Sequence, residues 1–256
     1  MSGVESLVKN VVCQRVISEK RLLESGFLVL VAEGCPEEVA EEIVLRTETF
    51  GTGWFYNLRA DVPARRKIFF VPLKVDGVET VVIKEKAPIV VGNPLLKHPT
   101  SSVIHEIRTA MVLGEIVKRL DLIEIAVNKK DLIINFSAQR PLGALVDLNS
   151  GQRWGFFDYV EGESPRVETS RVGGWNYLPE ERRKLYGQIH TALEEVGKAA
   201  LKAGVEPWDL GVHQVVLDIK KNIVGVTILD TEEYSLKKSG LWKGNSLPPV
   251  ILFPLF

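Results

Sequence analysis

The sequence is poor in cysteine and has no excess of charge of either sign. Cys13 and Cys35 are the two cysteines among 256 residues, and their spacing fits neither a metal site nor a disulfide framework. The 32 Lys and Arg residues balance the 33 Asp and Glu residues, so the chain lacks the strong field that attracts nucleic acids or membrane surfaces. We therefore expect a protein of a reducing cytoplasm that binds neither nucleic acid nor membrane.

Long apolar runs and glutamine are also scarce. No stretch approaches the roughly 18 apolar residues that a membrane span needs, and the N-terminus lacks the apolar core of a signal peptide. The chain holds five glutamines beside abundant Lys, Arg and Glu, a bias typical of thermophile proteins. With 45% hydrophobic residues, it can bury a core in one or two domains.

The first fifty residues predict structure and carry no chemistry. Apolar residues at helical spacing favour a helix from Val4 to Leu23, followed by a buried strand from Phe27 to Ala32. Pro36 and the acidic residues after it are typical of a helix start and predict a helix through Arg46. We expect residues 1–50 to form an N-terminal helix-strand-helix appendage.

Two aspartates and an amide have the spacing of a phosphoryl-transfer site. Asp209 is followed five residues later by Gln214, then by a hairpin pattern over residues 215–229, and Asp230 follows the second apolar run. Phosphoryl transfer needs one carboxylate at the acceptor hydroxyl and another that holds magnesium beside the phosphates. An aspartate after a strand is also a common turn residue, which is the structural alternative for Asp230.

This order resembles the catalytic loop and metal-binding aspartate of the protein-kinase-like fold, in the form used by aminoglycoside phosphotransferases and other small atypical kinases. The resemblance implies that Asp209 accepts the substrate proton, that Asp230 binds Mg²⁺, and that Gln214 stands where the family has a metal-binding asparagine. Pro207 replaces the family's histidine, and Thr231-Glu232 replaces its Phe-Gly. The side chain of glutamine is longer than that of asparagine, so Gln214 can bind a metal only if its loop lies further from the metal than the loop of the family does.

An earlier hairpin supplies a lysine, and the helix after it supplies a glutamate. Residues 67–75 and 78–84 flank Asp76-Gly77, a strong hairpin signal, and the second strand ends at Lys84. This strand is similar to the kinase strand whose lysine holds the nucleotide phosphates. Glu106, near the start of a helix over residues 102–120, is the candidate for the glutamate that pairs with this lysine.

Other readings of these two residues stay open. Lys86 and Glu115 are substitutes for the members of the pair. A lysine on a strand is also common on a solvated face, and a glutamate in the first turn of a helix complements the helix dipole.

A predicted linker and a long helix lie between the helix that contains Glu106 and the Asp209 loop. Strand patterns over residues 122–127, 132–136 and 142–146 precede Phe157-Asp-Tyr-Val-Glu-Gly162, which looks like the hinge of the same family. The resemblance implies that backbone groups around Tyr159 and Val160 bind adenine, whereas an edge strand ending in a turn is the structural alternative. A helix from Pro179 to a C-cap at Gly204 then leads into the Asp209 loop.

The glycine-rich phosphate loop is the largest missing piece. The segment 50–54 holds two glycines, and Arg59, Arg65 and Arg66 either bind phosphate instead or belong to a solvated loop. After Asp230 there remain 26 residues, too few for the platform on which protein kinases hold peptides. The apolar, Pro-broken tail over residues 247–256 either packs on the fold or enters a partner.

Together these patterns predict an α+β, two-lobed protein-kinase-like fold with an antiparallel N-lobe sheet and a truncated helical C-lobe. The expected domains are the appendage over residues 1–50, the N-lobe over 51–160, and the reduced C-lobe with its apolar tail over 161–256.

The predicted function is an atypical ATP- and Mg²⁺-dependent phosphotransferase. Its nucleotide-binding residues are Lys84, Glu106, Tyr159 and Val160. The alternative is a pseudokinase, a nucleotide sensor or scaffold whose partner binds the N-terminal helices or the tail. A third hypothesis, a metal-dependent nuclease using Glu79, lacks the Asp/Glu-x-Lys triplet at a strand end that would support it.

Overall fold

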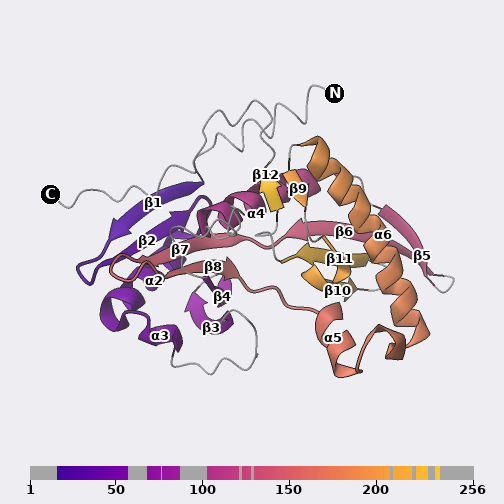
Figure 1. The fold of residues 1–256 in the computed structure, drawn as a ribbon, viewed down its shortest axis with the longest axis horizontal. Helices are drawn as coiled ribbons and strands as arrows, with labels where there is room; N and C mark the ends of the chain where they lie inside the picture. The colour runs from indigo at the N-terminus through magenta and orange to yellow at the C-terminus, as the bar shows by residue number, and fades with distance from the viewer. Residues whose placement is uncertain are drawn as a thin grey trace, which may run out of the picture.

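A computed structural model describes most of the chain as a mixed α+β fold (Figure 1). The described residues are 16–56, 68–75, 77–86, 103–120, 123–127, 130–203, 205–207, 210–220, 223–229 and 234–236. Most strands of the described residues belong to a six-stranded sheet or to a four-stranded sheet, and helices pack against both sheets (Figure 1). The α+β class expected from the sequence is therefore present.

The six-stranded sheet is antiparallel throughout, with the order β1-β2-β7-β8-β4-β3. Its strands are β1 (Ile17–Leu22), β2 (Phe27–Ala32), β3 (Ile68–Val75), β4 (Val78–Lys86), β7 (Pro141–Asp147) and β8 (Arg153–Asp158). The predicted β3–β4 hairpin is confirmed, with Gly77 at a φ of 79°, while Asp76 lies outside the described residues.

Alternating side chains of this sheet face two different layers. Val29 and Val31 of β2 share a core with α2 (Glu37–Phe50) and α3 (Gly53–Tyr56). Leu30, between those two valines, packs instead with α4 (Val103–Val117) on the opposite face. Successive strand residues point to opposite faces, so one buried strand supplies side chains to both layers.

The first described strand differs from the sequence expectation. Residues Ile17–Leu22 form β1, so the helix expected through Leu23 is wrong over this part, and residues 1–15 lie outside the described residues. Gly26, at a φ of 84°, closes a tight turn that lets β1 pair with the apolar β2. This pairing outweighs the weak helical spacing of the segment. Because β2 pairs with β7, strands from both sides of the boundary expected at residue 50 belong to one sheet.

The four-stranded sheet has the order β10-β11-β6-β5. Its strands are β5 (Ile123–Val127), β6 (Lys130–Ala138), β10 (Val215–Lys220) and β11 (Ile223–Ile228). β6 and β11 pair in parallel, and the other neighbours are antiparallel. The predicted strands exist, but β5 and β6, expected with residues 51–160, share their sheet with strands from residues 215–228. A strand pattern does not specify its partner, so the sequence could not show this.

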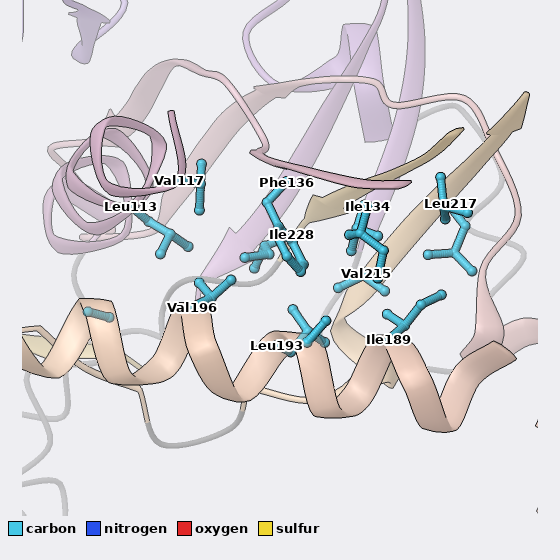
Figure 2. Packing of buried hydrophobic residues seen from close by; sticks show 14 of the residues in the cluster. Leu113, Val117, Ile134, Phe136, Ile189, Leu193, Val196, Val215, Leu217 and Ile228 are labelled. Carbon is cyan, nitrogen blue, oxygen red and sulfur yellow. The ribbon is translucent and has the colours of Figure 1, made fainter. Parts of the chain in front are cut away.

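The long helix α6 (Glu180–Lys202) covers the four-stranded sheet. The helix predicted to begin after Pro179 is confirmed, and its described C-cap is Ala203 because Gly204 lies outside the described residues. Ile189, Leu193 and Val196 recur at helical spacing and are buried. Figure 2 shows these three side chains directed toward Ile134, Phe136, Val215, Leu217 and Ile228 of the sheet. α4 contributes to this core and also packs on the six-stranded sheet.

Gln139 and Arg140 link β6 of the four-stranded sheet to β7 of the six-stranded sheet. Residues 159–164 link β8 to α5 (Pro165–Arg171). The remaining described elements are η2 (Trp175–Tyr177), β9 (Val205–Pro207), η3 (Val212–Gln214) and β12 (Tyr234–Leu236). None of the helices in the described part of the chain is long and apolar enough to cross a membrane.

Candidate functional site

Lys84 lies on β4, a central strand of the six-stranded sheet, and its side chain is 11% exposed. Its Nζ donates to Oε1 of Glu106 at 3.0 Å and to the carbonyl oxygen of Leu229 at 3.2 Å. The ammonium also lies 4.5 Å from the centroid of the Phe157 ring. An ammonium has three N–H donors, and the described contacts use two of them. Within the described residues, one N–H of Lys84 thus remains for a further acceptor.

Glu106 lies in the first turn of α4 and is fully buried. One carboxylate oxygen accepts from Lys84, and the other forms an ion pair with Lys86, two residues further along β4. Burial raises the pKa of Glu106, but the charges of the two lysines outweigh burial and lower this pKa to about 2. Glu106 is therefore ionised at neutral pH, with a lysine at each carboxylate oxygen.

Of the two substitutes named from the sequence, Lys86 lies in the cluster with Lys84 and Glu115 lies on the surface. Lys86 belongs to the same cluster as Lys84, with a side chain that is 3% exposed. Glu115 lies toward the other end of α4 and pairs with Lys118 at 2.6 Å on the surface. The sequence did not reveal that one carboxylate serves both lysines. The available signal was the two-residue spacing of the lysines, which puts both on one face of a strand.

The segments around the predicted aspartates are paired on both sides. β9 ends two residues before Asp209, and its partner β12 begins four residues after Asp230. Between the two aspartates, β10 and β11 form an antiparallel hairpin. Asp209 and Asp230 themselves lie outside the described residues. Their flanking segments are nevertheless held side by side, and the Lys84 contact reaches the residue before Asp230.

Gln214 joins these two segments through its backbone. It ends η3 and is 9% exposed. Its N–H donates to the carbonyl oxygen of Gly211 at 2.9 Å, and its own carbonyl oxygen accepts from the N–H of Leu229 at 2.9 Å. The predicted magnesium site would combine the Gln214 amide oxygen with Asp230, both hard oxygen donors of the kind Mg²⁺ takes. The described residues contain no group of three or more His, Cys, Asp or Glu arranged to hold a metal, and Asp230 is not among them.

The linker after β8 is anchored at both ends. Tyr159, 46% exposed, donates its N–H to the carbonyl oxygen of Thr80 at 3.2 Å. Glu163 and Leu217 exchange two backbone hydrogen bonds, each 2.8 Å long. Between these anchors, no backbone hydrogen bond within the described residues uses the N–H of Val160 or of the two residues after it. Among the described residues, these N–H groups are thus the linker donors without a backbone acceptor.

Gln139 crosses between the sheets beside this linker and was not singled out from the sequence. Its backbone N–H donates to the carbonyl oxygen of Ile228 at 2.9 Å, and its Nε2 donates to the carbonyl oxygen of Asp158 at 2.8 Å. The residue is 4% exposed. Gln139 thus ties β11 to the end of β8. A single glutamine between two strand patterns carries no signal of such a role, because its partners are distant in the sequence.

The two-glycine segment over residues 50–54 does not lie beside Lys84. It ends α2 and leads into α3, where the hydroxyl of Tyr56 donates to Glu85 at 2.6 Å. Glu85 points to the opposite face of β4 from Lys84, because neighbouring strand residues alternate. The segment therefore cannot act as a phosphate loop over this lysine. Arg59, Arg65 and Arg66 lie outside the described residues.

A shallow hollow borders the loop that follows Asp209. It is lined by Trp175 from η2, His190 from α6, and residues 210–213 of the loop, including His213. Its described lining contains no Asp, Glu, Lys or Arg side chain. An exposed indole beside two imidazoles suits a neutral, hydroxyl-bearing group, since the indole stacks on apolar faces and the imidazoles form hydrogen bonds.

Comparison with known proteins does not supply a family. No protein-family model matches the sequence, and a search of curated proteins finds no match. Function must therefore be inferred from the residues and contacts described above.

Proposed function

We propose that the protein is an atypical phosphotransferase that uses ATP and Mg²⁺ in a kinase-like site. The observation that carries the proposal is the position of the Lys84 ammonium. It binds the buried carboxylate of Glu106 on one side and the carbonyl oxygen next to Asp230 on the other. A strand lysine oriented by a helix glutamate and placed beside a metal-binding aspartate is what phosphate positioning requires.

The arrangement of the chain supports the same proposal. The lysine strand, the glutamate helix, the linker after β8 and the Asp209 loop follow one another in the order of the protein-kinase-like fold. A two-lobed reading places the six-stranded sheet and α4 in one lobe, and α5, α6 and the β10–β11 hairpin in the other. The nucleotide would lie between the lobes, where the linker and Gln139 join them.

Each residue then has a distinct role. Lys84 binds the nucleotide phosphates, and Glu106 orients it. Asp209 accepts the proton of the acceptor hydroxyl, while Asp230 and Gln214 bind Mg²⁺. The backbone of Tyr159 and Val160 receives adenine. The hollow at Trp175 holds a neutral acceptor beside the loop after Asp209.

A pseudokinase is the second candidate, and two observations favour it. Pro207, where the family has histidine, ends strand β9. The Asp158 carbonyl at the start of the linker already accepts a hydrogen bond from Gln139. In this reading the protein is a cytoplasmic nucleotide sensor or scaffold, and its partner binds the N-terminal helices, of which α2 is described, or the tail, which lies outside the described residues.

Thermal unfolding with and without Mg-ATP tests nucleotide binding. At a ligand concentration of about 100 times Kd, binding raises the unfolding free energy by about 2.7 kcal/mol, which corresponds to a rise in Tm of roughly 5 to 10 °C. Asp230→Ala should lose this rise. Asp218→Ala is the matched control, because Asp218 is an exposed aspartate of β10 paired with Lys220. A wild-type Tm that ignores Mg-ATP would overturn the proposal.

A second measurement separates the enzyme from the sensor. Transfer of labelled phosphate from ATP is measured against a panel of neutral hydroxyl compounds. An enzyme shows transfer that Asp209→Ala abolishes while its Mg-ATP stabilisation remains. Mg-ATP stabilisation without transfer to any acceptor favours the pseudokinase.

A further inference from the structure

Glu106 is shared by two lysines that differ in their access to solvent. Lys84 contacts one carboxylate oxygen at 3.0 Å and has a side chain that is 11% exposed. Lys86 pairs with the other oxygen and has a side chain that is 3% exposed. The carboxylate therefore has a lysine at each oxygen, and Lys84 is the lysine that a ligand can reach more easily.

The enclosed position of Lys86 makes it an anchor and not a contact for a ligand. Gln152 donates its Nε2 to the carbonyl oxygen of Lys86 at 2.8 Å, which fixes the backbone at the end of β4. β8 continues beside it, with Arg153 opposite Lys86 in the strand register. Lys86 contacts the oxygen of Glu106 that Lys84 does not contact, so it keeps the carboxylate bound when the Lys84 ammonium turns toward a phosphate.

We infer that Lys86 is a positioning residue, which holds Glu106 in place so that Lys84 stays oriented when it binds the nucleotide phosphates. This inference rests on the proposed function of Lys84. The contact with Lys86 keeps the position of Glu106 the same whether or not a nucleotide is bound. Lys86 acts through Glu106, so its effect on binding should disappear when Glu106 is made neutral.

A double-mutant cycle measured by titration calorimetry with Mg-ATP tests the inference. Lys86→Met removes the contact to one oxygen of Glu106 and leaves the Lys84 contact to the other oxygen. We expect it to raise Kd by about tenfold, the lower end of the effect seen when the partner of a binding residue is lost. In the Glu106→Gln background, Lys86→Met should change Kd by less than about twofold, because the residue through which it acts is gone.

A control variant separates positioning from general loss of a lysine. Lys118→Met removes a lysine that pairs with Glu115 on the same helix, but its side chain is 70% exposed. Its Kd should match the wild-type value. Circular dichroism of each variant at the titration temperature establishes that it is folded. If Lys86→Met is unfolded, Lys86→Gln takes its place in both backgrounds of the cycle.

The outcomes are distinct. An equal rise in Kd in both backgrounds would mean that Lys86 contacts the nucleotide directly, and an unchanged Kd in both would mean that it is only structural. Either result overturns the inference and leaves the proposed function intact. A wild-type protein that binds no Mg-ATP overturns the proposed function and the inference with it.

Discussion

At the scale of single residues, the buried Glu106 makes folding depend on pH. Its pKa in the folded protein is about 2, lowered from an ordinary value of 4.5. A lowered carboxylate pKa stabilises the fold above the ordinary value, and the stabilisation is lost as pH falls from about 4.5 toward 2. Its size, from the 1.36 kcal/mol that corresponds to one pKa unit, is on the order of 3 kcal/mol.

We predict that Glu106→Gln lowers the free energy of unfolding by about 3 to 5 kcal/mol at pH 7, because it removes the buried carboxylate that contacts both ammonium groups. The difference between the variant and the wild-type protein should shrink as pH falls from about 4.5 toward 2, since Glu106 of the unfolded chain is protonated in this range while Glu106 of the folded protein is still ionised. Urea unfolding at a series of pH values measures both effects.

Glu115→Gln is the matched control on the same helix. Its carboxylate is 37% exposed and pairs with a surface lysine. Its free energy of unfolding should stay within about 0.5 kcal/mol of the wild-type value at every pH, as surface pairs contribute little. A Glu106→Gln penalty that is the same at pH 7 and pH 2 would refute the role given to the charge.

The residues of the cluster show what sequence can and cannot predict. Lys84 and Glu106 could be proposed because the strand and the helix have recognisable patterns and a known spacing between them. The sharing of Glu106 with Lys86 could not, because it depends on how α4 lies across β4. The Lys84 contact to Leu229 joins residues 145 positions apart, and no local pattern specifies it.

At the scale of elements, the linker depends on one glycine. Gly162 has a φ of 150°, and a Cβ added there would lie 2.4 Å from the carbonyl oxygen of Leu217. The next residue, Glu163, makes the paired hydrogen bonds that fix the linker to β10. The glycine thus allows the close approach that anchors the linker.

Gly162→Ala should lower the free energy of unfolding by about 1 to 3 kcal/mol, because it combines backbone strain with a clash against β10. Urea unfolding measures the change. Gly187→Ala, in an exposed part of α6 with nothing within 4 Å of the added Cβ, should have the opposite sign. It is expected to raise the free energy by about 0.5 to 1 kcal/mol, because alanine favours helix more than glycine does. Equal effects from the two alanines would contradict this account of the linker.

Most elements were predictable, and the exceptions have a physical cause. The β3–β4 hairpin, α6 and the β10–β11 hairpin have strong local patterns, and the structure contains all three. β1 was mistaken for part of a helix because its polar sequence has weak periodicity, and pairing with β2 decides its conformation. Neither a turn nor a periodicity shows that β6 pairs in parallel with β11.

At the scale of the whole molecule, the two sheets are joined through a small number of contacts around the proposed nucleotide site. α4 packs on both sheets, Lys84 reaches Leu229, and Gln139 bridges β11 and β8. Expected boundaries at residues 50 and 160 do not follow the sheets, because β1 and β2 join the first sheet while β5 and β6 join the second. A ligand placed between the sheets would contact parts of the chain that are far apart in sequence.

Hydrogen exchange with mass spectrometry tests that placement directly. In the free protein, the N–H groups of Val160 and the next two residues have no backbone partner among the described residues and should exchange quickly. Mg-ATP should slow exchange in peptides that cover residues 159–163, 210–217 and 223–229, because the nucleotide would contact the linker and the segments beside both aspartates. Peptides of the β1–β2 hairpin should not change, since this hairpin lies at the far edge of the six-stranded sheet. Lys84→Met at the same Mg-ATP concentration should lose the protection. Protection confined to α2 and α3, on the other face of the sheet, would place the nucleotide away from Lys84 and contradict the proposed site.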